Sequence, residues 1–418
     1  MDSASLYDLS PALRLMIAGI LIACGPLLWI WMRNRNASLP RRLQALTVLT
    51  LFLTFDLTLF GAFTRLTDSG LGCPDWPGCY GKASPAGAHA DIAAAQAALP
   101  SGPVTHGKAW IEMIHRYLAT GVGVLILTLA VATWVAVRRQ RRAARPAAAA
   151  GGGRAPDGLQ AVPLSPWWPT ATLFWVCLQG AFGALTVTMK LFPAIVTLHL
   201  AGAVVLLALL CVQASRYSRA ATGRLPAAVG PGLRALVLLA LAMVAMQILL
   251  GGWVSTNYAV LACNTFPTCQ GRWWPEMDFS QGFQVWRELG LLRDGSSIGF
   301  AGLTAIHYAH RLFAYAVFAV LGLLAWRLRA VPALRRTGGW VGGLALWQFA
   351  TGLSNVVLDW PLAAAVSHTG GAAALVVALT WAACESRAAR PAASAAGPFR
   401  DGGRAGAASP TTVSSPLP

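Results

Sequence analysis

Long apolar runs recur along the whole chain, separated by short polar segments. Nine of them approach or exceed the ~20 residues that a helix needs to cross a bilayer. They lie at residues 13–32, 43–63, 109–137, 166–187, 192–215, 233–254, 300–326, 338–357 and 362–383. The pattern predicts an all-α polytopic membrane protein.

The overall composition agrees with a membrane class. Of 418 residues, 56% are hydrophobic and 11% are charged, whereas soluble domains carry about 25% charged residues. The net charge of +17 raises the question of nucleic-acid binding. However, the arginines cluster between apolar runs and form no basic folded domain. We therefore expect contact with membrane lipid and no nucleic acid.

The arginine-rich segments predict the orientation. They lie at residues 33–42, 138–145, 216–234 and 327–336, and nine spans place all of them on one side together with the carboxyl-terminal tail. The positive-inside rule makes that side cytoplasmic. The amino terminus is then expected outside and the carboxyl terminus in the cytoplasm.

The first apolar run, residues 13–32, is either a retained helix or a cleaved signal sequence. Its flank MDSASLYD is acidic where a signal peptide is basic, and no small-residue cleavage site follows. The flank also lacks the Arg-rich character of a mitochondrial presequence. We expect a retained helix in a bacterial plasma membrane. Residues 140–165 and 386–418 are rich in Ala, Gly and Pro and are predicted to be disordered.

A short cysteine-containing loop occurs twice. LGCPDWPGCYG (71–81) and LACNTFPTCQG (261–271) share Cys, Pro, Cys and Gly at the same relative positions. Polar residues in the later spans also pair between the halves, so the eight spans after the first divide as four plus four. The predicted units are an extra helix and turn (1–42), a first four-helix bundle (43–215), a linker (216–232), a second bundle (233–384) and a tail (385–418).

Each predicted bundle carries a histidine on its second helix and another on its fourth. These are His115 and His199 in the first half, and His310 and His368 in the second. Ionisable residues inside a membrane are costly and usually functional, although histidine also bonds helices together. At ~1.5 Å per residue, we place all four roughly 10 Å deep.

Two histidines at equal depth can ligate one iron from both sides, so the pattern predicts a bis-histidine heme in each bundle. Zinc fits less well, because structural zinc takes four protein ligands and catalytic zinc usually takes three with water.

The two halves differ one helical turn before the second-helix histidine. Glu112 precedes His115 by three positions, whereas His307 stands at the equivalent place before His310. Side chains at this spacing share a helix face, so Glu112 is a candidate for proton transfer beside the first site. The alternative is an ion pair between Glu112 and Arg116 that supports the site indirectly. His307 is either a spare ligand or a surface-facing histidine.

The run TRLTDSGLGCPDWPGC (64–79), followed by EMIHR (112–116) and the histidine pairs of both halves, resembles the heme A synthase family. The resemblance covers approximately residues 43–384. It implies that His310 and His368 ligate a heme b cofactor, and that His115 and His199 flank heme O as substrate beside Glu112. A ring methyl of heme O would be hydroxylated twice and lose water to give the formyl group of heme A.

The same resemblance implies partners. These are heme O synthase upstream, an electron donor, and assembly of the terminal cytochrome oxidase downstream; a homo-oligomer is compatible with it. Two other functional classes remain open. A di-heme b-type electron-transfer cytochrome needs both hemes permanently bound. A thiol oxidoreductase is expected to carry Cys-x-x-Cys, whereas the cysteines of both loops are more widely spaced.

The loop cysteines face the outer, oxidising side in this topology. Cys73 with Cys79, and Cys263 with Cys269, can therefore form disulfides. Such bonds either pin two irregular loops above the heme sites or, for the first pair, take part in redox chemistry or in handling the incoming heme.

Overall fold

The computed structural model describes residues 10–149 and 164–388 of the chain. Long helices dominate this part, and each predicted apolar run coincides closely with one of them. The helices are α1 (Ser10–Arg33), α2 (Leu39–Leu66), α4 (His106–Ala149), α5 (Trp167–Thr188), α6 (Pro193–Thr222), α7 (Pro231–Thr256), α9 (Phe300–Arg329), α10 (Arg335–Val357) and α11 (Leu362–Cys384).

Shorter elements connect these helices. They are α3 (His89–Ala98), α8 (Phe279–Gly282), two 3₁₀ turns (Ala259–Ala262 and Pro332–Leu334), β1 (Ala227–Val229) and β2 (Ser386–Ala388). Helix α4 continues to Ala149 and β2 lies at the start of the predicted tail, so the prediction of disorder is wrong at those two places. The rest of the predicted disordered linker and tail lies largely outside the described residues.

Eight helices of the described chain are long and apolar enough to cross a membrane. They correspond to eight of the nine predicted spans. Helix α10 falls short of this criterion, and its polar residues Gln348, Ser354 and Asn355 explain the lower hydropathy. It nevertheless packs along α9 and α11 within the second bundle.

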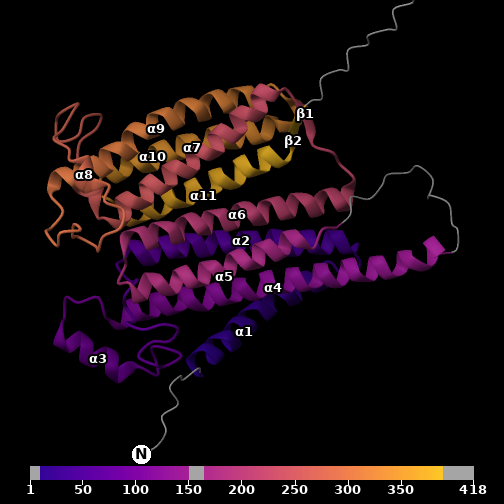
Figure 1. Cartoon of the computed structure of the whole chain (residues 1–418), viewed down its shortest axis with the longest axis horizontal. Coiled ribbons are helices and arrows are strands. Elements are labelled where there is room, and N and C mark those ends of the chain that lie inside the picture. Colours follow the sequence, from indigo (N-terminus) through magenta and orange to yellow (C-terminus); the bar gives the residue numbers. More distant parts are fainter. Residues whose placement is uncertain (1–9, 150–163, 389–418) are drawn as a thin grey trace, which may run out of the picture.

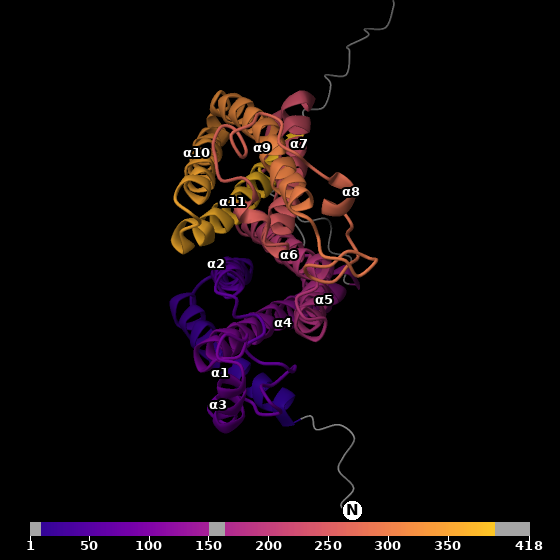
Figure 2. The same cartoon turned by 90° about the vertical axis from the view of Figure 1, so that its left-hand side faces the viewer.

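Two four-helix bundles lie side by side (Figure 1). Helices α2, α4, α5 and α6 form the first, and α7, α9, α10 and α11 form the second. Viewed end-on, α2 and α6 of the first bundle face α11 and α7 of the second (Figure 2). Helix α1 lies outside the first bundle, packed mainly on α4. The all-α architecture predicted from the sequence is thus confirmed.

The bundles have two distinct ends. The cysteine-containing segments, residues 67–105 and 257–299, lie together at one end, which we call the loop end (Figure 1). At the opposite end, the strand end, β1 pairs with β2 in parallel, with Ala227 opposite Ser386. The linker between the bundles is therefore joined to the segment that follows the last helix.

Local sequence explains how the helices begin, end and pack. Helix α6 begins at Pro193, whose fixed φ suits a first helical position, and it ends at Gly223 in the left-handed conformation with φ 68°. Along α2, four buried threonine hydroxyls donate to the carbonyl of the preceding turn, which satisfies them in an apolar setting. They belong to Thr47, Thr50, Thr54 and Thr58.

Candidate functional site

The four candidate histidines come from four different helices and form two pairs. His115 (α4) lies close enough to His199 (α6) for electrostatic interaction, and His310 (α9) stands in the same relation to His368 (α11). All four are half-buried. The second-helix members lie about three turns into their helices and the fourth-helix members about two, so their distances from the helix ends are less uniform than predicted.

A pocket lies at the histidines of the second bundle. His310 and His368 both line it, and most of the remaining wall is apolar. Aromatic side chains contribute much of the wall, namely Phe266, Tyr315, Phe318 and Phe349.

Both histidines of the second bundle have a polar side chain at Nδ1. The Thr351 hydroxyl lies 2.9 Å from His368 Nδ1, and Gln247 Nε2 lies 3.0 Å from His310 Nδ1. Thr351 also contacts the Trp347 carbonyl at 2.8 Å. A hydroxyl has one proton; when Thr351 donates it to that carbonyl, it accepts the proton of His368 Nδ1. The Nε2 lone pair of His368 is then available to a metal.

The histidines of the first bundle have less polar surroundings. His199 Nδ1 is buried and has no hydrogen-bond partner among the described residues. The His115 ring stacks on Phe60 with a centroid distance of 6.3 Å. An unpartnered buried nitrogen is uncommon, because burial without a hydrogen bond costs free energy. The two bundles therefore differ in whether the candidate ligand histidines have a polar partner at Nδ1.

A glycine faces each of the four rings. A Cβ on Gly61 would lie 3.1 Å from His115 Nε2, and one on Gly183 would lie 3.4 Å from His199 Cε1. In the second bundle, a Cβ on Gly251 would lie 2.9 Å from His310 Cε1, and one on Gly352 would lie 3.1 Å from His368 Cε1. Each imidazole therefore packs directly against the backbone of a neighbouring helix.

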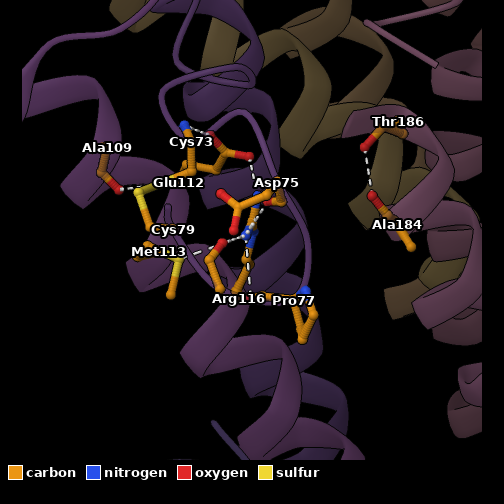
Figure 3. Close-up of polar contacts among 12 residues, drawn as sticks. Cys73, Asp75, Pro77, Cys79, Ala109, Glu112, Met113, Arg116, Ala184 and Thr186 are labelled. Carbon is orange, nitrogen blue, oxygen red and sulfur yellow. Dashed lines mark hydrogen bonds and ion pairs between the residues drawn. A yellow bond between two sulfur atoms is a disulfide. The ribbon is translucent and has the colours of Figure 1, made fainter. Parts of the chain in front are cut away.

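Glu112 is engaged on both of its oxygens (Figure 3). Oε1 accepts from Arg116 Nη2 at 2.5 Å, and Oε2 accepts from the Cys73 amide at 2.8 Å. Its side chain is 6% exposed and that of Arg116 10%. The ion pair considered from the sequence is thus present. The carboxylate links the helix of His115 to the cysteine loop.

Arg116 and Arg311 hold the two cysteine loops in equivalent ways. Arg116 Nη1 donates to the carbonyls of Asp75, Pro77 and Gly78 (Figure 3). In the second half, Arg311 donates to the carbonyls of Cys263, Thr265 and Thr268.

His307, at the position equivalent to Glu112, is buried, and its Nδ1 lies 3.0 Å from the Ala259 carbonyl. It also lines the pocket of the second bundle. Of the two alternatives for His307, the surface-facing histidine is therefore wrong, because a loop carbonyl satisfies the ring inside the protein.

Both predicted disulfides are confirmed. Cys73 is bonded to Cys79 with Cα atoms 4.9 Å apart, and Cys263 to Cys269 with Cα atoms 4.7 Å apart. These separations suit a disulfide crosslink. All four cysteines are almost completely buried. The bonds therefore lie inside the loops rather than on their surface.

The loop end also joins the two halves. Arg65 Nη1 donates to Asp68 Oδ1 and to the Tyr258 hydroxyl, each at 3.1 Å, and its Nη2 donates to the Ser255 carbonyl at 2.7 Å. The Tyr258 hydroxyl donates to Asp68 at 2.6 Å. We call Arg65, Asp68, Ser255 and Tyr258 the latch. Arg65 and Asp68 belong to the motif TRLTDSG, so part of that motif connects the bundles.

Two histidines alone make a poor site for a bare metal ion. No cluster of three or more His, Cys, Asp and Glu side chains suitable for a metal occurs in residues 10–149 and 164–388. A porphyrin iron needs only two axial ligands from the protein, because the macrocycle supplies the other four. Paired imidazoles, an apolar pocket and close glycine backbones fit a bis-histidine heme.

Sequence reasoning assigned no role to Gln247, Thr351 or the four glycines, although it pairs Gly183 with Gly352. The signal was present in the repeat itself. Gly61 and Gly251 are separated along the chain by the same interval as Cys73 and Cys263, and Gly183 and Gly352 by the same interval as His199 and His368. Comparing the halves position by position would have singled these glycines out.

Comparison with known proteins identifies the family. A family model described as "Cytochrome oxidase assembly protein" matches residues 44–380. The heme A synthase of Shewanella oneidensis is 36% identical over 333 residues, covering 79% of this chain and 92% of the relative. That of Methylobacterium radiotolerans is 30% identical over 340 residues, covering 76% of this chain and 82% of the relative. The chain therefore belongs to the heme A synthase family of cytochrome oxidase assembly proteins.

Proposed function

We propose that this chain is a heme A synthase, a membrane oxidoreductase that oxidises a ring methyl of heme O to the formyl group of heme A. Family membership supports the reaction class. The observation that carries the proposal is the presence of two histidine pairs, one in each bundle, with different polar surroundings. Two hemes with the same task would not need this difference.

His310 and His368 are the axial ligands of a resident heme b in this proposal. The pocket that both residues line is mainly apolar, as a macrocycle requires. Thr351 and Gln247 lie within hydrogen-bond distance of Nδ1 of the two rings, and such contacts orient each ring. The bound heme would supply redox chemistry. The surrounding residues hold its ligands and keep water away.

His115 and His199 flank heme O in the first bundle. Glu112, one helical turn from His115, is the proposed proton-handling group. Arg116 and the Cys73 amide hold its carboxylate in one place, and each carboxylate oxygen keeps further lone pairs for a proton. The substrate is a porphyrin in an apolar setting, so a buried carboxylate is a suitable local acceptor.

The reaction balances as two monooxygenations and a dehydration. Each hydroxylation takes one oxygen atom from dioxygen into a C–H bond, uses two electrons from a donor and two protons, and releases one water. The geminal diol then loses water to leave the formyl group. An electron donor is therefore a required partner, with heme O synthase as the source of substrate and cytochrome oxidase as the consumer of product.

We place the protein in a bacterial plasma membrane with the loop end outside. The strand end carries the arginine-rich segments and faces the cytoplasm under the positive-inside rule. Oxidised cysteines at the loop end agree with an outer, oxidising compartment.

The test is a heme analysis of purified variants and of the membranes that contain them. His310→Ala or His368→Ala is expected to remove most of the b-type heme spectrum, because an axial bond is lost. His115→Ala, His199→Ala or Glu112→Gln is expected to leave that spectrum largely intact while heme O accumulates and heme A disappears.

His106→Ala is the matched control. His106 stacks on His89 at the loop end, with a centroid distance of 4.4 Å, and lies outside both histidine pairs. It should change neither heme b content nor heme A formation. Loss of b-type heme in His115→Ala would mean that the two bundles are assigned in reverse. Two equally retained b-type hemes, with no effect on heme O in cells, would instead support an electron-transfer cytochrome.

A further inference from the structure

Two pairs of equivalent positions decide whether a ligand histidine has a polar partner. Gln247 of α7 corresponds in the repeat to Leu57 of α2, and Thr351 of α10 corresponds to Phe182 of α5. The equivalence is structural as well. One turn after Leu57 and after Gln247, a glycine faces the second-helix histidine of its bundle. Directly after Phe182 and after Thr351, a glycine faces the fourth-helix histidine. At both places the second bundle is polar and the first is apolar.

We propose that Gln247 and Thr351 are positioning residues that keep heme in the second bundle, and that Leu57 and Phe182 leave the first bundle able to exchange it. This inference rests on the proposed function. It adds a physical reason why one heme stays as cofactor while the other enters as substrate and leaves as product.

The polar partners act through the imidazole rings. A ligating histidine usually donates its second N–H to a fixed acceptor, and loss of that acceptor typically lowers metal affinity about 10- to 100-fold. Thr351 provides such an acceptor at 2.9 Å from His368 Nδ1, with its own proton directed to the Trp347 carbonyl. The ring is then held with Nε2 free for iron.

Gln247 is placed to do the same for His310. Its amide nitrogen lies 3.0 Å from Nδ1, and its Oε1 is buried without a partner among the described residues. Rotation of the carboxamide exchanges oxygen and nitrogen. The oxygen then accepts from His310 Nδ1–H, in exchange for the bond that Gln247 Nε2 donates to the His310 carbonyl at 3.1 Å.

The first bundle has no such acceptors at the equivalent places. Leu57 packs in the apolar cluster of Val122 and Ile126, and Phe182 packs against the cluster that contains Trp253. Within the described chain, His199 Nδ1 is left buried and unpartnered. Its ring therefore lacks the hydrogen bond that would orient it, and an axial bond to it breaks more readily.

The experiment replaces the polar side chains with apolar ones of similar shape and measures how fast heme is lost. Purified protein carrying b-type heme is mixed with excess apomyoglobin, and the rate of heme transfer is read from the absorption spectrum. Thr351→Val, which has nearly the same shape, is expected to lose heme about 10- to 100-fold faster than the unchanged protein. Thr351→Ser restores the hydroxyl and should return the rate to near its original value.

A second readout separates positioning from a general packing defect. A hydrogen bond to Nδ1–H makes the ligand more basic and stabilises ferric iron, so Thr351→Val should raise the midpoint potential of the b-type heme, and Thr351→Ser should not. Gln247→Leu copies the first-bundle residue and should show the same two changes independently. Conversely, Leu57→Gln is expected to slow the release of heme from the first bundle.

The possible results separate this inference from the proposed function. Unchanged transfer rate and potential in both Thr351→Val and Gln247→Leu would overturn the inference while leaving the cofactor site in place. Absence of b-type heme from the unsubstituted protein would instead overturn the proposed function.

Discussion

Alanine at Gly251 should disturb heme binding through a contact of measurable size. A Cβ there would lie 2.9 Å from His310 Cε1, whereas ordinary contacts begin at 3.4 Å. The ring must therefore move by about 0.5 Å, which is the tolerance to which functional geometry is usually held. Overpacking of this kind costs about 1–3 kcal/mol, which lowers the affinity for b-type heme roughly 5- to 150-fold.

The assay is the heme-to-protein ratio of purified Gly251→Ala, combined with titration of hemin into the heme-depleted protein. Gly352→Ala, with 3.1 Å to His368 Cε1, should have a smaller effect, since the ring needs to move less.

Gly343→Ala is the control from the same helix as Gly352, because a Cβ at that position meets nothing within 4 Å. It should keep the original heme affinity and gain up to about 1 kcal/mol of helix stability. An unchanged affinity in Gly251→Ala, or an equal loss in Gly343→Ala, would show that backbone contact does not fix the ligand rings.

Three further outcomes are expected. Replacing Cys263 and Cys269 with serine should lower the free energy of unfolding by about 2 kcal/mol, measured by thermal denaturation in detergent, and leave heme A formation intact; abolished heme A formation in a stable protein would indicate redox use. Tyr258→Phe removes the latch hydroxyl and should lower stability by about 1 kcal/mol or less, since the side chain is half-exposed; a larger loss would mean that the latch dominates association of the bundles. Reporter fusions after residue 150 and at the carboxyl terminus should both report the cytoplasm, and a periplasmic signal from either would refute the proposed orientation.

The architecture and the histidine pairs were predictable because they depend on patterns within single segments. Apolar length predicts the helices, and the repeat matches His115 with His310 without any knowledge of packing. Thr351 was not predictable in the same way, because a threonine on a membrane helix usually bonds its own backbone. Its contact with His368 depends on how α10 and α11 pack.

Glu112 shows the same limit. Its position correctly suggested an ion pair with Arg116 as one alternative, because side chains one turn apart on a helix are neighbours. The bond to the Cys73 amide was not accessible from the sequence. The position of that amide is set by the fold of a loop whose shape depends on a disulfide and on three carbonyl contacts to Arg116.

The two bundles are fastened to each other at opposite ends. The latch joins them at the loop end. At the strand end, Arg219 of α6 donates to the Cys384 carbonyl at 2.6 Å, and Ser215 of α6 donates to Glu385 Oε1 at 3.1 Å. Because the contacts lie at both ends of the interface, the two bundles cannot separate by opening at one end. A porphyrin is therefore expected to reach the first bundle sideways from the lipid, through a transient gap between helices, so that the surrounding bilayer serves as its supply route.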